Sequence, residues 1–155
     1  MIKLEKNLFV MFLISIAGKF LNLDGSGFMF VLVLMVLAFY YFIFTFFLLN
    51  KIKFDEIFKK YKYEKINIYW AFALIIFGWG HSLIILGILF YIQNWLGSYL
   101  IFSIGILIYC IFVLILLLLK FDNKQILYSK EILKRIGIYT LISIFIFITR
   151  NLGFI

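Results

Sequence analysis

The chain has 155 residues, of which 66% are hydrophobic and only 14% are charged, so its composition is not that of an ordinary soluble domain. Cys110 is the only cysteine, which excludes an intrachain disulfide and a cysteine-based metal cluster. The net charge is +8, but the basic residues gather beside apolar segments. This arrangement favours a membrane protein with a positive cytoplasmic side over a protein that binds nucleic acid.

Five apolar segments follow one another along the chain. A helix needs about 20 apolar residues to cross a bilayer core, and the uncharged run from Trp70 to Leu119 is long enough for two such helices. We therefore predict an all-α, polytopic helical membrane protein with one transmembrane domain over residues 1–155. Its five predicted spans cover residues 7–23, 28–49, 68–92, 99–119 and 136–150, of which the first and the last are short.

Two segments between the spans carry most of the positive charge. Six lysines lie between Lys51 and Lys65, and four lysines and one arginine lie between Lys120 and Arg135. Basic loops stay in the cytoplasm and attract anionic lipid headgroups. We expect both segments and the N-terminus on the cytoplasmic side of a bacterial inner membrane, with the lipid headgroups as partners. No small-residue cleavage pattern follows the N-terminal apolar segment, so we predict that it is retained.

An internal repeat is predicted from matches that keep their order. A shift of 72 residues aligns residues 22–26 with residues 94–98, each at the turn between two spans. The predicted units are residues 1–65 and 66–135, followed by a truncated third unit, so the spans form tandem helical hairpins. Repeats with an even number of spans are parallel, whereas inverted repeats are the commoner signature of secondary transporters.

The segment Gly87–Ser98 resembles a turn of small membrane proteins of Bacteroidetes, roughly G-x-x-F-K-I-x-H-W-P-G-A, and is similar to the transmembrane hairpin of the GldL family. That family supplies the inner-membrane stator of the gliding and type 9 secretion motor. The matching residues are Gly87, Phe90, Ile92, Trp95 and Gly97, and the departures are Tyr91, Asn94, Leu96 and Ser98. The resemblance implies a related hairpin and partners in an energised envelope complex.

One departure concerns chemistry. The second GldL helix carries a membrane glutamate used for ion flow, and Tyr109 occupies the matching position. A tyrosine, with an ordinary pKa near 10, cannot exchange protons as a carboxylate does at neutral pH. The resemblance therefore implies the scaffold without its proton site.

The same turn has a physical role of its own. Gly97 can adopt the positive φ that ends a helix tightly, and Asn94 can satisfy nearby backbone groups. Trp95 and Tyr99 are expected at headgroup depth as interface anchors.

His81, the only histidine, lies in the middle of an uncharged span with Gly78, Gly80 and Ser82 around it. Two alternatives stay open for these four residues. They can form a close helix contact with an interhelical hydrogen bond, or they can line a polar path for a proton or ligand. A serine hydrolase is excluded because adjacent helix residues point about 100° apart and no secure span carries an acidic residue.

Three further charges lie within or beside the spans: Lys19, Asp24 and Arg150. Snorkelling or solvation of a turn explains them, and a role in a subunit contact or a polar pathway is the alternative. The sequence predicts no catalytic, cofactor-binding or metal-binding residue. Between Phe54 and Ile66 the apolar spacing i, i+3, i+4, i+7 predicts a short amphipathic helix on the membrane surface, and a weaker pattern occurs at residues 126–133. A docking site for a partner protein is the alternative role of this helix.

Together these features favour a non-catalytic integral membrane subunit that packs against a larger inner-membrane complex, such as an energised motor or a secretion or uptake system. Other membrane protein subunits are the expected partners. The alternative is a small autonomous transporter or channel with a polar path near His81.

Overall fold

The computed structural model describes residues 1–21, 23–64, 66–118 and 123–151, and its regular structure is entirely helical. The elements are α1 (Ile2–Phe20), α2 (Ser26–Leu49), the 3-10 helices η1 (Phe54–Glu56) and η2 (Lys60–Lys62), α3 (Ile68–Ile92), α4 (Ser98–Leu118) and α5 (Asn123–Asn151). Within the described residues, α2, α3 and α4 are long and apolar enough to cross a membrane. The all-α prediction is confirmed, and the three candidate spans indicate a multi-pass membrane protein.

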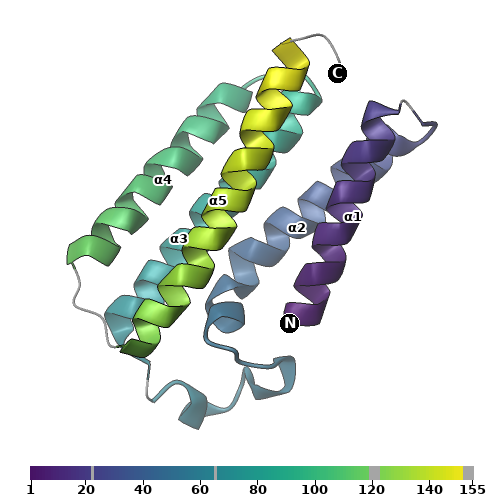
Figure 1. The fold of residues 1–155 in the computed structure, drawn as a ribbon. Helices are drawn as coiled ribbons and strands as arrows, with labels where there is room; N and C mark the ends of the chain where they lie inside the picture. The colour runs from purple at the N-terminus through teal and green to yellow at the C-terminus, as the bar shows by residue number, and fades with distance from the viewer. Residues whose placement is uncertain (22, 65, 119–122, 152–155) are drawn as a thin grey trace.

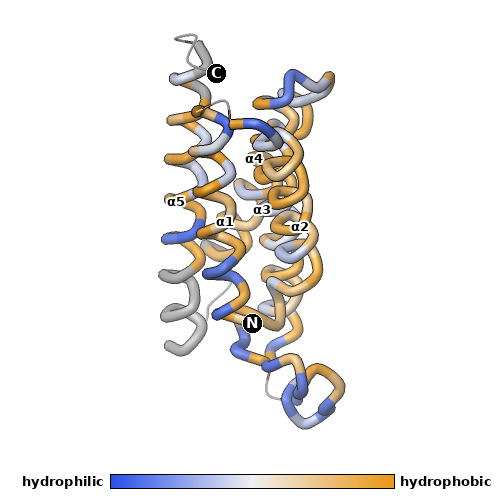
Figure 2. The backbone as a smooth tube through the Cα atoms, turned by 90° about the vertical axis from the view of Figure 1, so that its right-hand side faces the viewer, coloured by the Kyte–Doolittle hydropathy of each residue, from blue (hydrophilic) through white to orange (hydrophobic). Residues whose placement is uncertain are grey.

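The five helices run alternately up and down in one bundle (Figure 1). α3 is the central helix, since it packs against α2, α4 and α5, whereas α1 lies along α2. α4 stands at the edge of the bundle and packs mainly on α3 (Figure 1). The N-terminus and the loop between α2 and α3 lie at the same end. Figure 2 shows hydrophilic residues gathered at that end and apolar residues along the lengths of α2, α3 and α4.

The turn between α1 and α2 and the turn between α3 and α4 share a backbone hydrogen bond and a glycine of positive φ. Leu23 N–H donates to the Gly18 carbonyl, and Trp95 N–H, 72 positions later, donates to that of Phe90. Gly25 and Gly97 both have a positive φ, at 75° and 86°. Only glycine adopts this conformation without steric cost, so these two glycines allow the tight return of the chain. The repeat units of residues 1–65 and 66–135 stay a prediction.

Fully buried apolar side chains fill the half of the bundle nearer these turns. Leu34 and Leu37 of α2 and Ile85, Ile88 and Leu89 of α3 belong to one core and have no exposed surface. α2 and α3 are antiparallel, so residues before Tyr41 on α2 face residues after His81 on α3. The apolar layer is the name used below for these five residues: Leu34, Leu37, Ile85, Ile88 and Leu89.

Helix bounds differ from the prediction at both ends of the chain. α1 begins at Ile2 and ends at Phe20, earlier than the predicted span of residues 7–23. α5 begins at Asn123, so the described part of the second basic segment, expected as a loop, is helical. A segment without glycine or proline can continue a helix beyond its apolar part, which hydropathy alone does not report.

The prediction of an amphipathic helix after Phe54 is wrong, because the structure has the two short 3-10 helices η1 and η2 in this segment. Side chains compete here with α-helical hydrogen bonding. The Lys53 N–H donates to Glu56 (N···O 3.2 Å), Lys62 Nζ lies 2.8 Å from Glu56 Oε1, and the Tyr63 hydroxyl donates to the Ile57 carbonyl. These local contacts fold the chain into turns.

Candidate functional site

His81 lies at the centre of the bundle with no exposed surface. A hydrogen bond joins its Nδ1 to the hydroxyl of Tyr109 on α4. The imidazole also packs edge-on against Tyr41 of α2 and Tyr139 of α5, with ring centroids 4.3 and 4.4 Å away. Three helices therefore converge on this one residue of α3.

A second group of polar side chains lies towards the end that carries the N-terminus. Arg135 of α5 donates from Nε and Nη2 to the two carboxylate oxygens of Glu5 on α1, at 2.9 and 3.0 Å. The hydroxyl of Tyr41 donates to the same carboxylate at 2.8 Å. Both charged side chains are mostly buried, which agrees with the rule that buried charges are paired and hydrogen-bonded.

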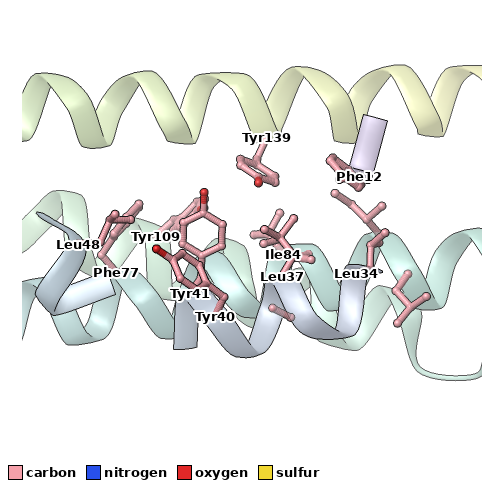
Figure 3. Close-up of a cluster of buried hydrophobic side chains, with 14 of the residues drawn as sticks. Phe12, Leu34, Leu37, Tyr40, Tyr41, Leu48, Phe77, Ile84, Tyr109 and Tyr139 are labelled. Atoms are coloured by element: carbon pink, nitrogen blue, oxygen red, sulfur yellow. The ribbon is translucent and has the colours of Figure 1, made fainter. Parts of the chain in front are cut away.

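Tyr41 joins the two groups, because its ring packs on His81 and its hydroxyl bonds to Glu5. Figure 3 shows Tyr139 projecting from α5 towards the buried side chains of α2 and α3. We call the whole set the polar cluster, and all five α-helices contribute to it: Glu5, Tyr41, His81, Tyr109, Arg135 and Tyr139.

Two atoms of the polar cluster lack a hydrogen-bond partner. They are Nε2 of His81 and the hydroxyl oxygen of Tyr139, the two buried side-chain polar atoms of this kind in the described part of the chain. Each requires an explanation, since buried polar groups are normally satisfied. A hollow of about 160 Å³ adjoins the cluster, lined by Glu5, Lys6, Phe9, Tyr41, Arg135, Ile138 and Tyr139.

The glycines beside His81 set the spacing of helices within this chain. A Cβ atom on Gly78 would lie 2.8 Å from Thr45 Cβ and 2.9 Å from the Tyr41 carbonyl oxygen on α2. A Cβ atom on Gly80 would lie 2.8 Å from Ile108 Cγ2 on α4. Both glycines thus face neighbouring helices of the bundle, and Ser82 is buried with them. These glycines do not form a surface for an external helix.

The predicted turn residues come together at the far end of α3 and α4. Asn94 has φ 57° and Gly97 has φ 86°, so both adopt the left-handed conformation that the tight turn needs. Trp95 packs edge-on against Phe90 at 5.0 Å, and the exposed Tyr99 packs against Tyr91 at 6.0 Å. None of these residues is a member of the polar cluster defined above.

Of the three isolated charges, Lys19 and Asp24 lie at the turn between α1 and α2. Lys19 is half-buried in the last turn of α1, with Nζ 3.9 Å from a Cβ built on Gly27, and Asp24 is exposed in the following turn. The side chain of Arg150 lies outside what the structure describes. The structure therefore does not join Lys19 or Asp24 to the candidate site.

Sequence reasoning did not identify Glu5, Tyr41, Arg135 and Tyr139 as site residues. Glu5 lies before the first predicted span, and Arg135 lies at the end of the second basic segment, which is expected in the cytoplasm. One signal was present: Arg135 directly precedes the last apolar segment, and Glu5 lies two positions before the first. Such oppositely charged flanks can pair only if their helices lie side by side, which periodicity does not predict.

Among the described residues, no group of three or more His, Cys, Asp or Glu side chains is placed to hold a metal ion. No family model, curated protein or solved structure matches the chain.

Proposed function

We propose that the protein is a non-catalytic integral subunit of a larger complex in the bacterial inner membrane, and that α4 carries the contact with its partner. The observation behind this proposal is a stripe of leucine and isoleucine on the exposed side of α4. Its members are Leu100, Ile104, Leu107, Ile111, Leu114 and Leu118, all exposed. Their spacing alternates between four and three residues, which is the heptad pattern of knobs-into-holes packing between helices.

The opposite side of α4 is already used within the chain. Gly105 lies against Ile84, and Tyr109 and Phe112 are buried towards α3. Because α4 stands at the bundle edge (Figure 1), the heptad stripe is open to a helix of another subunit. The resemblance of the α3–α4 turn to the GldL hairpin supports an energised motor, secretion or uptake system as the complex.

Photo-crosslinking in the native membrane tests this proposal. A photoreactive residue is placed at Leu107 on the stripe and, as the matched control, at Phe39 on the exposed side of α2. We expect a discrete protein adduct from Leu107 and none from Phe39, with the same partner recovered in stoichiometric amount by a mild-detergent pull-down. Adducts with lipid alone from both positions would contradict the proposal.

The five-span topology is part of the proposal. α1 and α5 extend alongside the three apolar candidate spans (Figure 1), and the Glu5–Arg135 pair lowers the cost of holding their charges at the membrane boundary. Positive charge near Lys3 and in the loop after α2 favours a cytoplasmic location for this end. Reporter fusions at the two ends of the chain test the orientation: we expect a cytoplasmic N-terminus and an external C-terminus.

A small autonomous transporter is the second candidate, favoured by the unpartnered Nε2 of His81 and hydroxyl of Tyr139. These atoms could bind a transported species at mid-bundle. However, the apolar layer lies between His81 and the turn between α3 and α4. Transport would therefore need a second conformation. Flux in proteoliposomes that His81→Ala abolishes would favour this candidate over the subunit.

A further inference from the structure

The tip of the loop between α2 and α3, residues 58–61, exposes aromatic and basic side chains together. Phe58 is 98% exposed and Tyr61 is 58% exposed, and the side chains of Lys59 and Lys60 between them are exposed as well. We propose that this loop tip is a binding site for anionic phospholipid headgroups. In this site the two aromatic rings enter the membrane interface and the two lysines contact lipid phosphate. The inference is independent of the function proposed for α4.

The base of the loop is held by contacts to α2. Phe54 packs edge-on against Phe44 at 5.3 Å, and Tyr63 stacks on Phe46 at 6.2 Å. Ile52 is buried. These contacts fix both sides of the loop, so the tip is presented in a defined place.

The charge of the loop also favours an anionic ligand. Glu56 is paired with Lys62 at 2.8 Å, so this carboxylate is already compensated by a lysine of the loop. Asp55 and Glu64 are exposed, but they lie outside the segment 58–61, which itself carries only positive charge. A phosphate group that approaches Lys59 and Lys60 therefore meets no acidic residue within the segment 58–61.

The loop is well placed to reach the membrane surface. It leaves α2 at Leu49 and enters α3 at Ile68, and both helices are long and apolar enough to span. Figure 2 shows it at the hydrophilic end of the bundle, beside the N-terminus. Aromatic rings favour the headgroup region, and lysines are attracted to an anionic membrane surface. Together these two preferences favour a lipid over an acidic protein as the ligand.

The experiment uses the full chain in nanodiscs, with Cys110→Ser as background and a nitroxide at Tyr61→Cys, which leaves Phe58 and the two lysines of the loop tip in place. As phosphatidylglycerol replaces phosphatidylcholine, we expect the accessibility of the label to a water-soluble nickel reagent to fall by about threefold. The matched control is a nitroxide at Leu96→Cys, which is 95% exposed in the uncharged turn at the other end. Its accessibility should not change with lipid charge.

A pair of double variants separates a lipid site from general attraction. Lys59→Gln/Lys60→Gln should remove the response of the Tyr61 label to phosphatidylglycerol, whereas Lys3→Gln/Lys6→Gln, with the same loss of charge at the same end, should preserve it. Equal effects of the two double variants would overturn the site. A Tyr61 label that remains in water in every lipid mixture would also overturn it and would assign the exposed rings to a protein partner.

Discussion

Arg135 of α5 and Glu5 of α1 form a bidentate ion pair across 130 positions of sequence, with N···O distances of 2.9 and 3.0 Å. The pair joins the first and last helices at the end of the bundle that carries the basic loop. Tyr41 of α2 adds a third hydrogen bond to the carboxylate, so three helices share one charged group.

Removal of one partner of this pair should destabilise the protein strongly. Arg135→Met leaves the mostly buried Glu5 carboxylate without its cation, and we expect a loss of about 3 kcal/mol, from the range for broken buried pairs. The double variant Glu5→Gln/Arg135→Met removes both charges and should recover most of that loss. Thermal unfolding in detergent measures the stability of the single and double variants. Equal losses in the single and double variants would show that the charge pairing itself contributes little.

Gly78→Ala should disturb the bundle from within. The added Cβ would lie 2.9 Å from the Tyr41 carbonyl oxygen, a backbone atom that cannot move aside readily, so we expect a loss of about 1–3 kcal/mol. Gly137→Ala on α5 is the matched control, since no heavy atom lies within 4 Å of a Cβ there. The control should be neutral or slightly stabilising because alanine favours helix. Equal unfolding temperatures for the two variants would contradict the close α2–α3 contact.

The hydrogen bond between His81 and Tyr109 should be measurable through a double-mutant cycle. His81→Phe keeps a ring between Tyr41 and Tyr139 but leaves the Tyr109 hydroxyl without this partner, so we expect a loss of about 1–3 kcal/mol. Adding Tyr109→Phe should restore part of the stability. If the second substitution adds a further full loss, the two side chains are not coupled.

The loop after α2 should loosen at both extremes of pH. Hydrogen bonds from Lys62, first, and from the Lys53 amide lower the pKa of Glu56 from its ordinary value of 4.5, and the hydrogen bond to Glu56 raises the pKa of Lys62 from 10.5. The contribution of Glu56 to the stability of the loop is present above pH 4.5 and is lost as pH falls through the lowered pKa of this carboxyl. The contribution of Lys62 to the stability of the loop is present below pH 10.5 and is lost as pH rises through the raised pKa of this amine.

A nitroxide at Tyr61→Cys in the Cys110→Ser background reports this loosening as a rise in mobility. Glu56→Gln should abolish the pH dependence and leave the loop mobile at neutral pH. Since both charged groups are at the surface, the effect on global unfolding should be small. A label whose mobility does not change between neutral and acidic pH would contradict a role of the pair in ordering the loop.

The sequence predicts some parts of this structure well and others poorly. α3 has the predicted bounds of residues 68–92, and α2 and α4 nearly match theirs, because a long uncharged apolar run has no other stable arrangement in a bilayer. The role of Gly97 was also predicted, since a tight return between two spans needs a positive φ, and the structure adds Gly25 in the same role. The surface helix expected at residues 54–66 failed because side-chain hydrogen bonds specific to that loop outweigh a four-residue apolar spacing.

The sequence by itself determined the helical membrane class, the three most apolar spans and the central place of His81 in one of them. These features follow from composition and local spacing. The tertiary structure alone decided that Gly78 and Gly80 face α2 and α4 of the same chain, and that Glu5, Tyr41, Arg135 and Tyr139 join His81 and Tyr109 in one polar cluster. The physical reason is that each of these contacts depends on which helices are neighbours and how they are rotated, and hydropathy carries neither quantity.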